Sequence, residues 1–275
     1  MVSAPEHIDL VVGEAASPST TSPRTKPVPQ APGIPVPFSY AASDDGTDEN
    51  LLILLHGLGD THLHFAKLGR QLRLPQTATL ALRAPERIPF LYDEEAFQWY
   101  ESFDALGELL TRPNPTPALD LLGKVLAYLI RECSWSARQI HLFGFAQGGS
   151  VAAELGVRWW REHASDAEPG SVALGSVVSV EGPLLSHPTL AQPSPTPVLV
   201  FHHTAAQLPP AALGSYRKGY GAVREAEVRG SGGMPRSKED WQEIMRFWSE
   251  VLGRRQAGDL YEVLSGGPSQ QKFQN

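Results

Sequence analysis

Apolar residues follow two different spacings along this chain. Residues 51–55 are continuously apolar (Leu-Leu-Ile-Leu-Leu), which is typical of a β-strand that is buried on both faces. Between Ala118 and Glu132, leucines recur three or four positions apart, as they do on one face of an amphipathic helix. The two spacings alternate through most of the chain, and this order predicts a parallel sheet covered by helices on both faces.

The same reasoning predicts the remaining elements. We expect an edge strand at 37–41, buried strands at 51–55, 78–83, 139–145, 171–180, 197–203 and 222–228, and helices at 61–73, 118–132, 147–163 and 237–252. The predicted fold class is therefore α/β, with a mostly parallel central sheet.

The two ends of the chain differ from the middle. Residues 13–37 are rich in Ser, Thr, Pro and Ala, a composition that buries too little apolar surface to offset its ordering entropy. The final residues are also polar and contain glycine. We expect a disordered N-terminal segment (1–35), one folded domain (36–255) and a flexible C-terminal tail (256–275).

Composition excludes several classes of protein. A net charge of −7 over 275 residues provides no basic surface for nucleic acid. No stretch approaches the length of about 18 apolar residues that a membrane span requires, and the acidic first residues argue against a signal peptide. The single cysteine, Cys133, excludes an internal disulfide framework. We expect a cytoplasmic protein.

Candidate chemistry begins at residues 144–148 (Gly-Phe-Ala-Gln-Gly). They follow a predicted strand and open a predicted helix, which is the context of the nucleophile elbow in serine hydrolases. Gly144 and Gly148 suit a turn that is too tight for side chains. However, Ala146 stands where the nucleophilic serine belongs, and a methyl group cannot attack a carbonyl carbon.

A second motif, residues 56–60 (His-Gly-Leu-Gly-Asp), follows the 51–55 strand. In α/β-hydrolases a main-chain N–H from such a loop pairs with the N–H of the residue after the nucleophile to hold an oxyanion. The corresponding residues here are Leu58 and Gln147. His56 is expected to brace the loop.

Together with Gly233-Met234 before the last helix, these motifs make residues 37–254 resemble the acyl-protein thioesterase and carboxylesterase family of small α/β-hydrolases. The resemblance implies a compact α/β-hydrolase domain without a large lid. In active members it also implies hydrolysis of esters or thioesters by Ser, Asp and His, with no cofactor.

The other two catalytic positions of this family are also changed. The stretch that should carry the acid contains no carboxylate, and Ala206 is the nearest match to its position. Arg236 occupies the position of the histidine base, and an arginine stays protonated at any working pH. A laboratory Ser→Ala substitution at Ala146 would leave the other two residues intact, so the triple change favours natural loss of catalysis over an engineered mutant.

Displaced residues could still supply the missing chemistry. Ser150 lies one helical turn past Ala146 and is expected to face packing, and Glu181 follows a strand at a position where some α/β-hydrolases carry their acid. His202 and His203 end another strand and could reach the site, although local hydrogen bonding is the simpler explanation of both. A metal site built from histidines 56, 62, 64, 202 and 203 is disfavoured, because no cysteine or His-Glu-x-x-His motif joins them.

The remaining groove could bind a ligand. The Leu58 and Gln147 amides, the start of the helix at Gln147 and an inward-turned Arg236 would form an anion-binding cleft, although Arg236 could instead face solvent beside Glu239 or Asp240. Residues 92–117 are aromatic and acidic, and Trp99 and Phe103 in this insertion could line a hydrophobic slot, form a protein contact or simply pack in the core.

These observations predict a catalytically inactive α/β-hydrolase that binds a small anionic or acyl ligand, or a protein partner, without cofactor or metal. The alternatives are an active esterase or thioesterase that uses displaced residues, and a structural subunit with a vestigial pocket.

Overall fold

The computed structural model describes one compact unit, Arg24–Arg255. Its described residues are 24–89, 95–104, 106–165, 169–204, 208, 210–230 and 232–255. The expected N-terminal segment up to residue 23 and the expected tail 256–275 lie outside the described residues.

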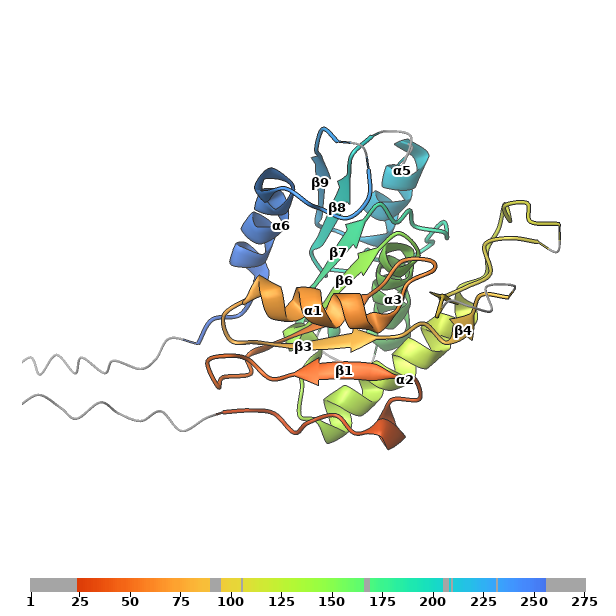
Figure 1. Ribbon diagram of the computed structural model, residues 1–275. Coiled ribbons are helices and arrows are strands. Elements are labelled where there is room, and N and C mark those ends of the chain that lie inside the picture. Colours follow the sequence, from red (N-terminus) through yellow and green to blue (C-terminus); the bar gives the residue numbers. More distant parts are fainter. Residues whose placement is uncertain are drawn as a thin grey trace, which may run out of the picture. The chain divides into compact units, whose positions relative to one another are not determined.

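A seven-stranded sheet runs through this unit in the order β1-β3-β2-β6-β7-β8-β9 (Figure 1). Its strands are β1 (Phe38–Ala41), β2 (Asn50–Leu55), β3 (Thr77–Leu82), β6 (Ile140–Phe145), β7 (Ser176–Val180), β8 (Val198–His202) and β9 (Val223–Glu227). The edge strand β1 pairs antiparallel with β3, and every other pair in the sheet is parallel. The predicted α/β class with a mostly parallel sheet is confirmed.

Helices connect the strands and cover both faces of the sheet. They are α1 (His62–Leu72), α2 (Thr116–Glu132), α3 (Gln147–His163), α4 (Pro169–Val172), α5 (Pro210–Gly219) and α6 (Lys238–Val251), with short 3-10 turns at Ala31–Gly33 and Ala137–Gln139. Two of the starts have side-chain caps: Thr61 accepts from the Leu63 amide, and Ser237 forms a capping box with Asp240. A separate two-stranded sheet, β4 (Glu86–Arg87) with β5 (Phe97–Gln98), precedes α2.

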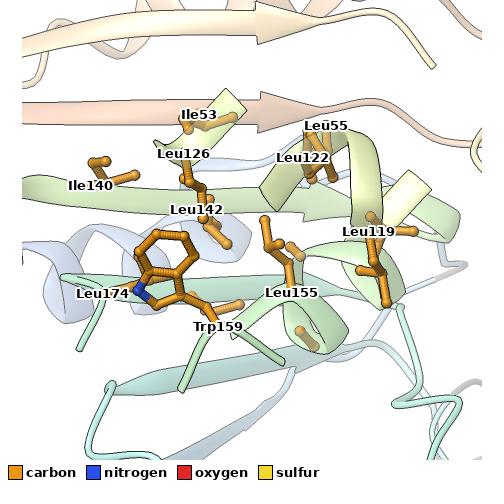
Figure 2. Packing of buried hydrophobic residues seen from close by; sticks show 14 of the residues in the cluster. Ile53, Leu55, Leu119, Leu122, Leu126, Ile140, Leu142, Leu155, Trp159 and Leu174 are labelled. Carbon is orange, nitrogen blue, oxygen red and sulfur yellow. The ribbon is translucent and has the colours of Figure 1, made fainter. Parts of the chain in front are cut away.

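The continuous apolar run of β2 is explained by two cores on opposite faces of the sheet. Leu51, Ile53 and Leu55 pack into the cluster that α2 and α3 cover, part of which is shown in Figure 2. The alternate residues Leu52 and Leu54 pack on the other face, among side chains of α1 and α6. Because successive side chains point to opposite faces, only an unbroken apolar run can fill both cores.

The folded unit begins earlier than the sequence predicts. Arg24 bridges to Thr47, the Lys26 amide donates to Asp48, and Ile34 is buried. The expected domain start at residue 36 is therefore corrected to residue 24, because residues 24–35 find backbone partners and a buried apolar side chain that their composition does not reveal.

Two elements also differ from their expected form. β7 begins at Ser176 instead of 171, because Pro169–Val172 forms the short helix α4. Helix α5 was not expected: its sequence, Pro-Ala-Ala-Leu-Gly-Ser-Tyr-Arg-Lys-Gly, has two glycines and a weak apolar spacing.

Two glycine-to-alanine substitutions in helices should have opposite effects on stability. A Cβ at Gly148 in α3 would collide with the carbonyl oxygens of Leu55 and His56, whereas one at Gly123 in α2 would meet nothing within 4 Å. We expect Gly148→Ala to lower the free energy of unfolding by about 3 kcal/mol and Gly123→Ala to raise it by up to about 1 kcal/mol. Urea unfolding of both variants measures their free energies of unfolding. Similar small changes in this free energy at the two positions would show that α3 does not pack tightly on β2.

Candidate functional site

The elbow between β6 and α3 keeps the backbone of a nucleophile turn although its central residue is alanine. Ala146 has φ 49° and ψ −114°, a conformation that side-chain-bearing residues rarely adopt and that costs of order 1–3 kcal/mol. Its N–H donates to Val180 O (2.8 Å) and its carbonyl accepts from Ser150 N (3.0 Å). A Cβ at Gly144 would collide with the Gly148 carbonyl, so the glycine frame is required by the close approach of the turn.

The loop of residues 56–60 follows β2 at the same edge of the sheet as the elbow. Gly59 has φ 83°, and its N–H donates to Phe97 O (2.9 Å), which holds the loop against β5. Leu58 is partly exposed, at 38%. In the described part of the chain, the main-chain N–H groups of Leu58 and Gln147 donate to no protein acceptor.

His56 braces this loop from inside. The ring is completely buried, and its Nε2 accepts from the Ala84 amide (2.9 Å), so Nδ1 carries the proton and donates to Gly57 O (2.7 Å). Burial is the main reason why the pKa of His56 lies below its ordinary value. Both ring nitrogens bond to the backbone, as expected of a residue that braces the loop, and neither is available for direct contact with a ligand.

Gln147 ties the elbow to the insertion that follows β5. Its Oε1 accepts from the Trp99 amide (2.9 Å), and its Nε2 donates to Tyr100 O (2.9 Å) and Ser102 Oγ (2.7 Å). The side chain is thus fully engaged, which leaves the backbone N–H as the group of Gln147 that can meet a ligand.

Trp99 packs in the core. Of the three alternatives that the sequence left open, which are a hydrophobic slot, a protein contact and core packing, the structure shows core packing. Its exposure is 0%, and its indole N–H donates to His56 O (2.8 Å). The assignment of Trp99 to a ligand-binding slot is therefore corrected: a ring without accessible surface holds the oxyanion loop in place but lines no open groove. Phe103, by contrast, is 46% exposed.

The acid and base positions expected from the family resemblance are Ala206 and Arg236, and the structure describes only the second. Ala206, the expected acid position, lies outside the described residues. Arg236 is exposed, and its backbone N–H donates to Asp240 Oδ2 (2.9 Å). The Arg236 Nη2 atom lies 3.9 Å from the position that a Cβ at Gly233 would occupy. The guanidinium therefore lies over the loop before α6 and is not enclosed in a pocket.

A carboxylate and an imidazole meet beside the elbow. Glu181 Oε1 accepts from His203 Nδ1 (2.8 Å) and from the Gly233 amide (2.8 Å), and both side chains are largely buried, at 11% and 4% exposure. Glu181 follows β7, whose last residue bonds to Ala146, and adopts φ 53°. The sequence suggested each of these residues separately but not their pairing, although both directly follow neighbouring parallel strands.

Two of the remaining candidates, His202 and His64, have local partners, and two others are buried. His202 bonds to Thr204 O and to Glu225 Oε1, which agrees with local hydrogen bonding. Ser150 and His62 are buried, at 1% and 9% exposure. His64 is exposed and paired with Asp60 (2.6 Å). In the described ranges no three His, Cys, Asp or Glu side chains are grouped as metal ligands, and no helix there is long and apolar enough to cross a membrane.

Comparison with known proteins identifies the family. The phospholipase/carboxylesterase family model matches residues 39–247. This chain belongs to the phospholipase/carboxylesterase family of α/β-hydrolases. An uncharacterized hydrolase of Mycosarcoma maydis, UM10204, is 40% identical over 225 residues, which cover 79% of this chain and 82% of that protein.

Solved structures of an esterase and of an acyl-protein thioesterase share the fold. The esterase PE8 aligns with a TM-score of 0.63 at 22% identity, over 79% of this chain and 98% of its own. Acyl-protein thioesterase 2 of Zea mays aligns with a TM-score of 0.63 at 21% identity, over 79% of this chain and all of its own (100%). These likenesses show the shared fold, and the family match makes the chain an α/β-hydrolase of the phospholipase/carboxylesterase type.

The burial of His56 predicts how stability depends on pH. Because its folded pKa is lowered, the unfolded chain binds a proton more readily, so His56 costs stability as the pH falls below about 6.5. Replacing His56 with Gln should reduce the slope of unfolding free energy against pH below 6.5, by at most about 1.4 kcal/mol per pH unit. Urea unfolding between pH 7.5 and 5 measures the slope. The control Trp99→Phe keeps the imidazole and should keep the slope; an unchanged slope in His56→Gln would mean that His56 is not held neutral.

Proposed function

We propose that this protein is a catalytically inactive α/β-hydrolase that binds the carbonyl or carboxylate end of an acyl ligand at the position of the serine nucleophile in active members of the family. The observation that carries the proposal is Ala146 itself. The residue keeps the strained elbow geometry, with φ 49°, while its methyl group offers no nucleophile.

The base position supports the same conclusion. Arg236 stands in the slot of the family's histidine, and a guanidinium cannot accept a proton at neutral pH. Serine chemistry needs a base beside the nucleophile to take its proton. A serine restored at position 146 would therefore still lack its partner.

The groups left at the site favour an anionic or carbonyl oxygen. The Leu58 and Gln147 amides have no protein acceptor among the described residues, and Gln147 opens a helix of 17 residues whose positive end faces the elbow. Arg236 adds an exposed cation on the loop before α6. A fatty carboxylate would combine this charge with an apolar chain, and it is the ligand class that we propose.

The inactive assignment predicts that Ala146→Ser will not restore hydrolysis. Wild type and Ala146→Ser should both leave a short-chain aryl ester intact, and neither should react with a serine-directed fluorophosphonate, because Arg236 at the base position cannot take the proton of a serine at position 146. The measurements are release of the phenol and mass spectrometry of the labelled protein.

Leu58→Pro is the matched control for background turnover, since it removes one of the two oxyanion donors. Aryl ester hydrolysis by the wild type clearly above that of Leu58→Pro would overturn the inactive assignment. Robust activity in Ala146→Ser would show that a base other than position 236 reaches the elbow.

The second candidate function is hydrolysis by displaced residues, which the Glu181–His203 pair supports. A carboxylate on Nδ1 is how an acid orients a histidine base in a triad. In such a reaction the imidazole takes a proton from water while the water oxygen bonds to the acyl carbon. The proton then passes to the departing alkoxide or thiolate as its bond to carbon breaks.

Substitutions of the pair distinguish this second candidate from the first. If the pair is catalytic, His203→Asn and Glu181→Gln should each lower ester or thioester turnover by a factor of about 100 or more. The exposed histidine variant His187→Asn serves as the control and should leave turnover unchanged. We expect instead that none of the three differs from background, measured by thiol release from an acyl thioester.

A further inference from the structure

The insertion before α2 forms a hairpin that is held by its own bonds. Phe103 and Leu109 pair as an antiparallel bridge, and the Leu110 amide donates to Ser102 O (2.9 Å). Asp104 Oδ1 accepts from the Leu106 amide (2.8 Å) and the Glu108 amide (2.9 Å), which closes the turn. The segment stands away from the sheet and helices of the same unit (Figure 1, yellow-olive), so its fold does not depend on burial against them.

This hairpin exposes large apolar side chains. Leu106 is 86% exposed, Leu109 73% and Phe103 46%, and the two leucines have the highest exposures among the large hydrophobic residues described. Single exposed apolar residues are ordinary, but here three lie within seven positions of one turn, and Phe103 and Leu106 line the same groove. We refer to these three side chains as the apolar patch.

A groove lies beside the patch. It has a volume of about 380 Å³, and Ile88, Pro89, Phe103 and Leu106 contribute its apolar wall. Glu101 and Gln98 line the same groove. Apolar side chains of a partner could therefore enter the groove while the hairpin tip covers them.

Charge indicates the chemistry of the occupant. Residues 95–110 contain four acidic residues (Glu95, Glu101, Asp104 and Glu108) and no basic one. Glu86 lies close to Glu101: burial, and then repulsion by Glu101, raises the pKa of Glu86. A neighbouring cation would relieve this repulsion, whereas an anionic lipid surface would add to it.

We propose that the 102–110 hairpin and its groove bind a protein partner through a segment that carries both apolar and basic side chains. The apolar side chains would fill the groove against Phe103 and Leu106, and the basic ones would face Glu101 and Glu108. The groove is lined by none of the elbow residues, although Ser102 at the base of the hairpin accepts from Gln147 Nε2. The proposal does not depend on the ligand proposed at Ala146.

A labelled synthetic helix with leucine on one face and lysine on the other provides the probe, and fluorescence anisotropy gives its Kd for the full chain. We expect Leu106→Ser with Leu109→Ser to weaken binding by at least about tenfold. Glu101→Gln with Glu108→Gln should weaken it about threefold and reduce its salt dependence. The matched controls are Leu63→Ser, an exposed leucine on α1, and Glu132→Gln, an exposed carboxylate at the end of α2; neither should change the Kd.

Three outcomes would overturn the proposal. The first is that the control variants weaken binding of the helix as much as the test variants do, or that a leucine/glutamate helix binds with the same Kd. Either result would mean that the contact is unspecific. The second is flotation with phosphatidylcholine vesicles that the leucine variants lose, which would make the patch a membrane contact. The third is a concentration-dependent dimer in sedimentation that the same variants abolish, which would make the occupant a second copy of this chain.

Discussion

The fold of the site depends on how closely the first turn of α3 approaches the strands beside it. Side chains at Gly144 and Gly148 would collide with the backbone, and one at Gly149 would come within 2.8 Å of Ser179 Oγ. This contact fixes the direction of α3 and forces position 146 into its positive φ. It also carries the Gln147 amide to the edge of the sheet where Leu58 lies. The elbow geometry is therefore a property of the glycine frame and does not require a serine.

An alanine at position 146 is therefore compatible with the complete surrounding scaffold. His56, Trp99 and Gln147 belong to one connected set of buried hydrogen bonds. The Ala84 amide donates to the His56 ring, the Trp99 indole donates to the His56 carbonyl, and the Trp99 amide donates to the Gln147 side chain. Each bond satisfies a group that would be costly to bury alone. The set holds the 56–60 loop, the elbow and the insertion together, and none of its bonds involves the side chain at position 146.

Much of this architecture can be predicted from the sequence because its strands are buried on both faces and its elbow requires glycines at fixed positions. The runs at 51–55 and 140–145 and the helices after them follow from apolar spacing alone. Trp99 could not be placed, because an aromatic residue in an insertion can equally line a groove or fill the core. The Glu181–His203 bond also escaped prediction: strand order brings their strand ends together, but side-chain direction after a strand depends on local backbone, here φ 53° at Glu181.

The central claim is that an acyl ligand binds at the elbow through two main-chain amides. An NMR titration of the 15N-labelled protein with decanoate tests it most directly. The account predicts saturable shifts that are largest for the Leu58 and Gln147 N–H resonances, with decanoate unchanged after prolonged incubation. Unperturbed Leu58 and Gln147 resonances at concentrations of decanoate that shift other residues, or no saturable shift anywhere, would contradict it.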